Sequence, residues 1–75
     1  LAAVTCAPIT RTIRGIASEV EVGPETGLPE AGVITCDNVI TVPKERLDPA
    51  PVGVLTLAQR IRLDQALRFA LDIAY

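Results

Sequence analysis

The sequence predicts an α+β fold that is mainly β, in which four strands precede one C-terminal helix. Two observations carry this prediction. β-branched residues dominate Val33–Val42, which suits a pleated, half-buried surface, and apolar residues recur at helical spacing after Thr56. Hydrophobic residues make up 49% of the chain but aromatic residues only 3%, so the core has to be built from aliphatic side chains. A chain of this length forms one domain at most, and we expect residues 1–75 to be a single domain.

Four stretches show the alternation and the β-branched residues that are typical of strands. These expected strands are Ala3–Thr10, Ala17–Val22, Val33–Val42 and Val52–Leu55. Between the second and the third, Gly23–Gly32 is rich in glycine and proline and must be a loop. In the second strand Glu19 and Glu21 fall on the same side, so we expect an acidic face in contact with solvent.

The long strand Val33–Val42 carries a polar interruption at its centre. A period of two divides its other residues into one face with Ile34, Cys36, Ile40 and Val42 and another with Val33, Thr35, Val39 and Thr41. Asp37 and Asn38 interrupt both faces, and an unpaired buried polar group would cost ~1–3 kcal/mol. The pair predicts a β-bulge or a satisfied internal network, or else two polar side chains that are held toward a bound molecule.

The final helix is expected from Leu57 to about Ala74. Thr56 and Gln59 have the spacing of a capping box, and Asp64 with Arg68 makes a favourable i,i+4 ion pair. One broad face of the helix is apolar, and we interpret it as the face that covers the strands. Its members are Leu63, Ala66, Leu67, Ala70, Leu71, Ile73 and Ala74.

Composition argues against several classes of site. With no histidine and only two cysteines, a zinc site is not expected, and the carboxylates are too dispersed to suggest another metal; we expect no cofactor. The net charge of −2 argues against a protein that binds polyanions regardless of their sequence. No apolar run approaches the ~20 residues of a membrane span. Cys6 and Cys36 are expected to be free thiols of a cytosolic protein.

Two segments of the chain resemble one family of proteins. Val33–Leu47, which reads Val-Ile-Thr-Cys-Asp-Asn-Val-Ile-Thr-Val-Pro-Lys-Glu-Arg-Leu, resembles the late strand of MazF/PemK toxins, the endoribonucleases of type II toxin–antitoxin pairs. Ala7–Val20 resembles the segment that follows their third strand, and with the closing helix the resemblance covers essentially the whole chain. It implies a small SH3-like (CcdB/MazF-type) barrel with a C-terminal amphipathic helix. It also implies a cytoplasmic homodimer that has a cognate antitoxin and does not associate with a membrane.

The resemblance further implies an activity and a site. The expected activity is sequence-selective, metal-independent cleavage of single-stranded RNA that leaves a 2′,3′-cyclic phosphate. In the family, a threonine at the end of the third strand acts together with an arginine from an early loop, and Thr10 occupies this threonine position as the expected catalytic residue. Hydroxyl and guanidinium groups can stabilise a charged phosphorane, and an amide and a carboxylate can read base edges. The expected RNA-binding residues are Arg11, Thr12, Arg14, Asp37 and Asn38.

The sequence also leaves other interpretations open. The two strands that open the family's domain, with the loop that carries its arginine, have no counterpart here, so we expect an N-terminally truncated toxin that cleaves RNA poorly unless Arg11 or Arg14 compensates. A basic loop is often no more than solvated surface. The alternative function is a catalytically weak module that mainly binds its antitoxin or a partner subunit. A purely structural small barrel would leave the Thr/Arg loop and Asp37-Asn38 unexplained.

Overall fold

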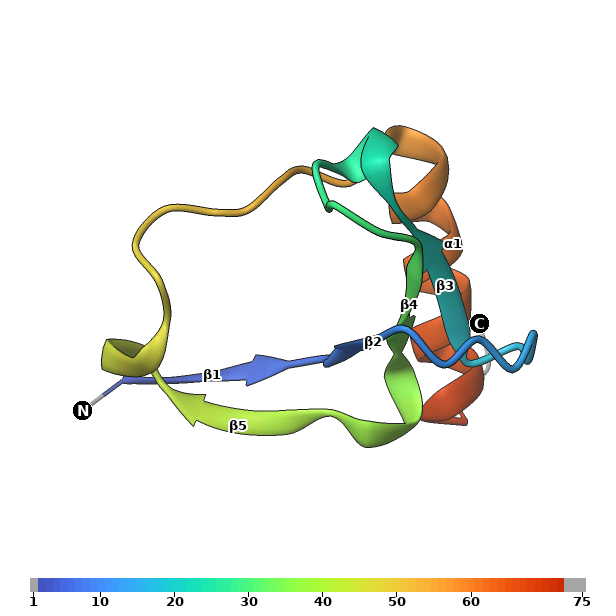
Figure 1. The fold of residues 1–75 in the computed structure, drawn as a ribbon. Coiled ribbons are helices and arrows are strands. Elements are labelled where there is room, and N and C mark those ends of the chain that lie inside the picture. Colours follow the sequence, from blue (N-terminus) through green and yellow to red (C-terminus); the bar gives the residue numbers. More distant parts are fainter. Residues whose placement is uncertain (1, 73–75) are drawn as a thin grey trace.

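The computed structural model describes residues 2–72, which form a mainly β fold with one C-terminal helix, as the sequence predicts (Figure 1). The strands are β1 Ala3–Cys6, β2 Ile9–Thr10, β3 Glu19–Val22, β4 Gly32–Thr35 and β5 Ile40–Pro43, and the helix is α1 Leu57–Ala70. Short 3-10 helices lie between them: η1 Pro24–Thr26, η2 Cys36–Asn38 and η3 Lys44–Arg46. Within residues 2–72 the strands form two separate antiparallel sheets and no closed barrel.

One sheet is a two-stranded ribbon of β1 and β5, and the other is three-stranded with the order β2-β4-β3. Each of the two longest strands expected from the sequence is therefore divided between the sheets. Ala3–Thr10 breaks before Pro8, because proline has no N–H for a ladder, and Val33–Val42 breaks at the turn η2. Thr35 joins the two bends, since its N–H and its hydroxyl both donate to the Pro8 carbonyl, at 2.8 and 3.1 Å.

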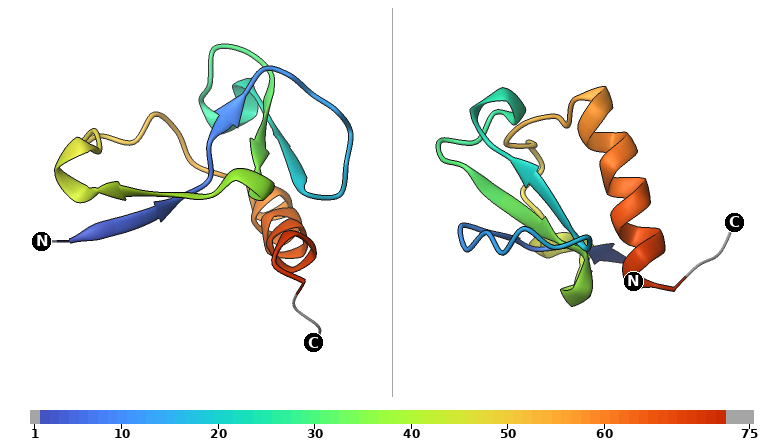
Figure 2. Two further views of the ribbon diagram at one scale, coloured as in Figure 1. Left: turned by 90° about the horizontal axis from the view of Figure 1, so that it is seen from below. Right: turned by 90° about the vertical axis from the view of Figure 1, so that its right-hand side faces the viewer.

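The core lies between α1 and the strands β3 and β4, and Figure 2 shows the helix crossing beside them. Its buried members are Val20, Val22, Ile34, Cys36 and Ala66, and the residues packed against them are Ala7, Leu28, Leu55, Leu63, Leu67 and Ala70. The shared face predicted for Ile34 and Cys36 is confirmed. The same prediction is wrong for Ile40, whose side chain is 55% exposed, because beyond η2 the chain leaves the core and enters the ribbon.

The N-terminus of α1 is tied to the sheet through one glutamine. The predicted capping box is confirmed: the Gln59 N–H donates to the Thr56 hydroxyl at 3.1 Å, and the Thr56 N–H donates to the Gln59 Oε1 at 2.9 Å. Gln59 Oε1 also accepts from the Thr26 hydroxyl at 3.0 Å. Gln59 Nε2 donates to the Glu21 carbonyl at 3.3 Å and to Glu25 at 2.9 Å. This buried side chain therefore satisfies the helix cap, a strand and the turn η1 at once.

The C-terminal end of α1 departs from the prediction. The ion pair between Arg68 and Asp64 is confirmed at 2.9 Å. The helix, however, ends just before Leu71, so this leucine is 55% exposed and not packed on the core. The contacts expected of Ile73 and Ala74 lie outside the described residues.

The expected edge strand Val52–Leu55 is wrong. The segment is irregular, and its valines are 69% and 76% exposed. One backbone bond attaches it to the preceding loop, from the Val54 N–H to the Thr26 carbonyl at 2.9 Å. Gly53 passes so close that a Cβ atom there would lie 1.7 Å from the Thr26 oxygen. The segment packs by close backbone approach and lacks the repeated ladder of a strand.

Both cysteines are free, as expected from the sequence. Burial raises the pKa of the Cys36 thiol, the neighbouring Asp37 charge raises it further, and Arg62 opposes the rise only in part. Cys36 therefore serves as a neutral apolar residue of the core. In the part of the chain that the structure describes, no helix is long and apolar enough to cross a membrane.

Candidate functional site

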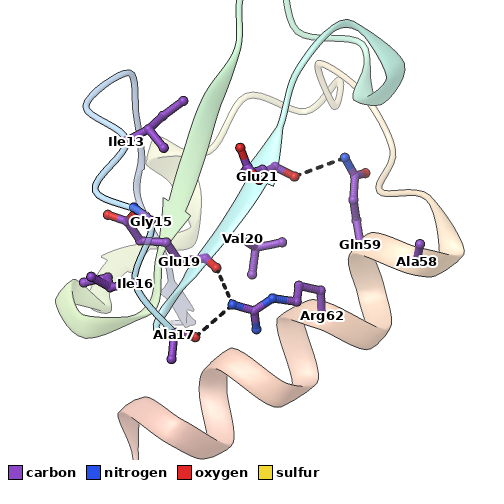
Figure 3. A pocket seen from close by; sticks show the side chains of 10 residues that line it. All are labelled: Ile13, Gly15, Ile16, Ala17, Glu19, Val20, Glu21, Ala58, Gln59 and Arg62. Carbon is purple, nitrogen blue, oxygen red and sulfur yellow. Dashed lines mark hydrogen bonds between the residues drawn. The ribbon is translucent and has the colours of Figure 1, made fainter.

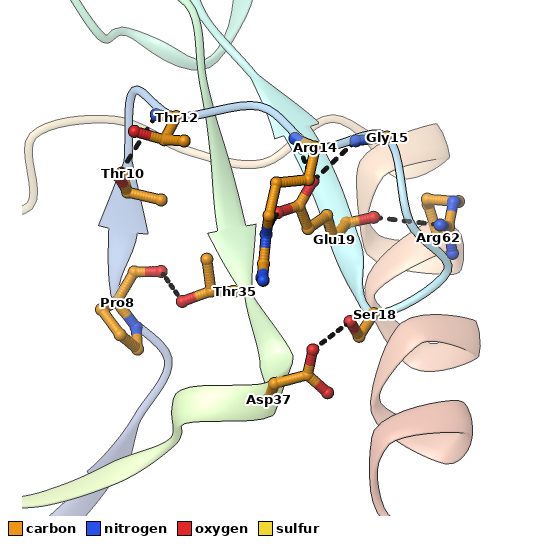
Figure 4. Close-up of polar contacts among 10 residues, drawn as sticks. All are labelled: Pro8, Thr10, Thr12, Arg14, Gly15, Ser18, Glu19, Thr35, Asp37 and Arg62. Atoms are coloured by element: carbon orange, nitrogen blue, oxygen red, sulfur yellow. Dashed lines mark hydrogen bonds and ion pairs between the residues drawn. The ribbon is translucent and has the colours of Figure 1, made fainter.

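A groove of about 420 Å³ lies where β2, β4 and the loop after β2 meet. Its lining residues are Pro8, Thr10, Thr12, Arg14, Thr35 and Asn38. Four of the six site residues predicted from the sequence are thus brought together, although they come from positions as distant as Thr10 and Asn38. Arg11 and Asp37 are not among the residues that line the groove. Figure 4 shows most of these side chains around it.

Thr10 is placed by the pairing of β2 with the central strand β4, where it faces Val33 in the register. A Cβ atom on Gly32 would lie 2.6 Å from the Thr10 carbonyl oxygen, so only a glycine lets the two strands approach this closely. The Thr10 hydroxyl oxygen accepts a hydrogen bond from the Thr12 N–H at 3.2 Å, a turn that threonine commonly forms. The hydroxyl keeps its own proton for donation into the groove.

Arg14 is held by the buried carboxylate of Glu19. Glu19 Oε1 accepts from the N–H groups of Arg14 and Gly15 at 2.9 and 3.0 Å, and Glu19 Oε2 accepts from Arg14 Nε at 3.0 Å. The Glu19 side chain is only 2% exposed and that of Arg14 is 51% exposed. Burial raises the pKa of Glu19, but the hydrogen bonds and charge of Arg14 and the N–H of Gly15 outweigh it, so the pKa lies below the usual 4.5. The prediction of a solvated acidic face is therefore wrong at Glu19.

Asp37 is exposed, and the Ser18 hydroxyl donates a hydrogen bond to its carboxylate. Ser18 itself is buried, and its carbonyl accepts from the Cys36 N–H at 2.9 Å. The polar interruption of the long strand is thus the turn η2 with a satisfied carboxylate, one of the alternatives that the sequence offers. Asn38, the second residue of the pair, lines the groove.

Arg11 points to a different neighbour. Its guanidinium forms an ion pair with Glu30 of the following loop, and both side chains are largely exposed. Exposed pairs of this kind contribute little to stability, ~0–1 kcal/mol. Arg11 therefore remains available at the surface outside the groove.

A second hollow, of about 620 Å³, lies between β3, α1 and the preceding loop (Figure 3). Arg62 crosses it and donates to the carbonyls of Ala17 and Glu19 at 3.1 and 2.9 Å, while Gln59 donates to the Glu21 carbonyl. These carbonyls lie on the outer edge of β3, which pairs with no further strand among residues 2–72. Helix side chains therefore cap an edge that would otherwise be open to association.

Sequence patterns alone do not single out Glu19, Ser18 and Thr35, although each one orients a residue of the site or the two bends beside it. For Glu19 a signal exists: an acidic residue follows Arg14 by five positions, across a glycine at which the loop can turn back. For Ser18 and Thr35 the partners are 19 and 27 residues away, so no local pattern reveals them. Within residues 2–72 no group of three or more His, Cys, Asp and Glu side chains gathers in a way that could hold a metal ion.

Comparison with known proteins places this arrangement in a family. The family model described as "PemK-like, MazF-like toxin of type II toxin-antitoxin system" matches residues 1–71. The chain belongs to this toxin family. It is 41% identical to "Endoribonuclease MazF3" of Mycobacterium tuberculosis (strain CDC 1551 / Oshkosh) over 70 residues, which are 93% of the chain and 67% of that relative. The relative of the same name from strain ATCC 25618 / H37Rv matches equally.

Solved structures of family members share the fold. "Mycobacterium tuberculosis toxin MazF-mt6" matches with a TM-score of 0.91 and 40% identity, covering 100% of the chain and 75% of that toxin. "Endoribonuclease in complex with its cognate antitoxin from Mycobacterial species" matches with a TM-score of 0.86 and 31% identity, covering 100% of the chain and 70% of that protein. The family resemblance read from the sequence is thus confirmed over almost the whole chain.

Proposed function

We propose that the protein acts as a sequence-selective, metal-independent endoribonuclease toxin on single-stranded RNA, as a single domain with residues 10–14 and 35–38 at its site. The observation that carries the proposal is the groove, in which the hydroxyl of Thr10 and the guanidinium of Arg14 lie together with Asn38. The relatives named as endoribonucleases support the same activity. The two sheets, which meet at Thr35, are proposed to belong to an SH3-like barrel.

The proposed reaction uses the ribose of the substrate. The 2′-oxygen forms a bond to phosphorus, the bond from phosphorus to the 5′-oxygen breaks, and the products are a 2′,3′-cyclic phosphate and a 5′-hydroxyl. Thr10 donates a hydrogen bond to the phosphoryl oxygens where negative charge develops, and Arg14 binds the phosphate as a fixed cation. Thr12 and Asn38 contact the RNA within the groove. Arg11 and Asp37 contact it beyond the rim, Asp37 as an acceptor for base amino groups.

The test is cleavage of a fluorescently labelled single-stranded RNA in the presence of EDTA. Removing one well-placed donor typically lowers a rate by about 10²–10³, and we expect a loss of this order in Thr10→Ala. Thr41→Ala is the matched control, because Thr41 is exposed on β5 and does not line the groove. Undiminished cleavage by Thr10→Ala, or cleavage that EDTA abolishes, would refute the proposal.

The proposed protein partners are a cognate antitoxin and a second copy of the chain. The antitoxin is supported by the relative that was solved with its own antitoxin. The homodimer is supported by the ribbon of β1 and β5, whose outer edges pair with no strand in the described residues, and by Ile9 and Ile40, which are 53% and 55% exposed. Unpaired edges promote association. Sedimentation at micromolar concentration tests this, and a stable folded monomer would contradict it. Its proposed location is the cytoplasm, where its RNA substrate would be met.

A further inference from the structure

The contact between Glu19 and Arg14 has features that an ordinary surface ion pair lacks. The carboxylate is almost completely buried and accepts three hydrogen bonds, two of them from backbone N–H groups of a single turn. Gly15 in this turn has a φ of 69°, a conformation that glycine adopts without strain. The carboxylate therefore fixes the backbone from which the Arg14 side chain departs, in addition to the side chain itself.

The bond to Glu19 uses only one end of the guanidinium. Nε of Arg14 is bound at 3.0 Å, and among the described residues neither terminal nitrogen has a hydrogen-bond partner. In Figure 4 the far end of the Arg14 side chain points toward the space between Thr35 and Asp37, and Arg14 and Thr35 both line the groove. A guanidinium presents its donors in a rigid fork, so one edge can be fixed while the other meets a ligand.

We propose that Glu19 is a positioning residue, which holds the forked end of Arg14 toward a backbone phosphate of RNA in the groove. This inference rests on the proposed RNA-cleaving function. The phosphate would receive two N–H donors from a side chain that is already ordered before binding. An arginine without such a partner would have to lose its rotamer freedom on binding, which weakens affinity. A lysine could not replace Arg14, because its single ammonium cannot bind Glu19 and present a fixed fork to phosphate.

The proposal opposes the simplest electrostatic expectation. Glu19 is a negative charge beside a phosphate site, so its charge alone should weaken RNA binding, and its removal should strengthen it. If Glu19 positions Arg14, its removal should weaken binding. Glu21 supplies the matched control, because it is an exposed glutamate two residues along the same strand and does not line the groove.

The experiment measures the affinity of the protein for a fluorescein-labelled, non-cleavable 2′-O-methyl single-stranded RNA by anisotropy, with thermal unfolding of each variant as a check on folding. We expect Glu19→Gln to bind roughly two- to tenfold more weakly and Glu21→Gln to bind as tightly as the parent or slightly more tightly. In the Arg14→Ala background Glu19→Gln should have no further effect. The NMR signal of the Arg14 Nε–H should be protected from exchange in the parent and lose this protection in Glu19→Gln.

The outcomes separate the two proposals. Binding that is unchanged in Arg14→Ala would overturn RNA binding in the groove and the positioning role together. A loss in Arg14→Ala with equal or tighter binding by Glu19→Gln would overturn only the positioning role, as would a loss that persists when Arg14 is already alanine. Should Glu19→Gln fail to fold, Arg14→Lys decides: a loss as large as that of Arg14→Ala supports the role, and parental affinity overturns it.

Discussion

Gln59→Leu should destabilise the fold far more than an ordinary helix substitution. Leucine has a similar volume and leaves no large cavity, but it cannot replace the bonds that Gln59 makes to Thr26, Thr56 and the Glu21 carbonyl. Thr26 is buried, and each buried polar group left without a partner costs about 1–3 kcal/mol. Two such groups amount to about 2–4 kcal/mol. Unfolding free energies of ~0.05–0.15 kcal/mol per residue predict roughly 4–11 kcal/mol for the whole chain.

The assay is thermal unfolding followed by circular dichroism. For a domain of this size 1 kcal/mol shifts Tm by about 4–8 °C, so we expect Gln59→Leu to lower Tm by roughly 8–30 °C. The matched control is Gln65→Leu, since Gln65 is exposed on the same helix and such surface changes stay within about 0.5 kcal/mol. Thr26→Val should add little to Gln59→Leu, because the two residues share one bond. Equal shifts in Gln59→Leu and Gln65→Leu would refute this account of the network.

Three further outcomes follow from the contacts. Gly53→Ala should cost about 1–3 kcal/mol of stability in chemical denaturation, because its Cβ would overlap the Thr26 carbonyl oxygen; an unchanged midpoint would show that the segment shifts freely. The pKa of Glu19 lies below 4.5 in the folded state, so its contribution to stability is present above pH 4.5 and is lost as the pH falls through the folded pKa. Unfolding midpoints measured across this acid range should therefore fall less steeply for Glu19→Gln, and parallel curves would contradict the assignment. Arg11→Ala should leave Tm nearly unchanged, because its pair with Glu30 is exposed, yet reduce the salt dependence of RNA binding by up to about 0.7 per phosphate contact; an unaltered slope would remove Arg11 from the RNA-binding residues.

Local patterns in the sequence were sufficient for the parts of the fold that local chemistry controls. The capping box of Thr56 and Gln59 and the loop rich in glycine and proline each depend on residues a few positions apart. Thr10 and Asn38 were found by resemblance to a family, because the residues around them match its motifs. The groove that contains both was not predictable from spacing, since they are 28 positions apart in the sequence.

What tertiary structure decided is where each strand ends and which charges are buried. Val33–Val42 reads as one strand because its alternation is nearly continuous, but the chain changes sheets at η2, where Thr35 is bound to the distant Pro8 carbonyl. Glu19 reads as a solvated residue because charged side chains in an alternating strand usually face water. Its burial becomes favourable only when the loop before it folds back and supplies the donors of Arg14 and Gly15. The sequence by itself determined the element types and the chemistry available; long-range hydrogen bonds determined which groups face the groove, because their partners meet only in the folded chain.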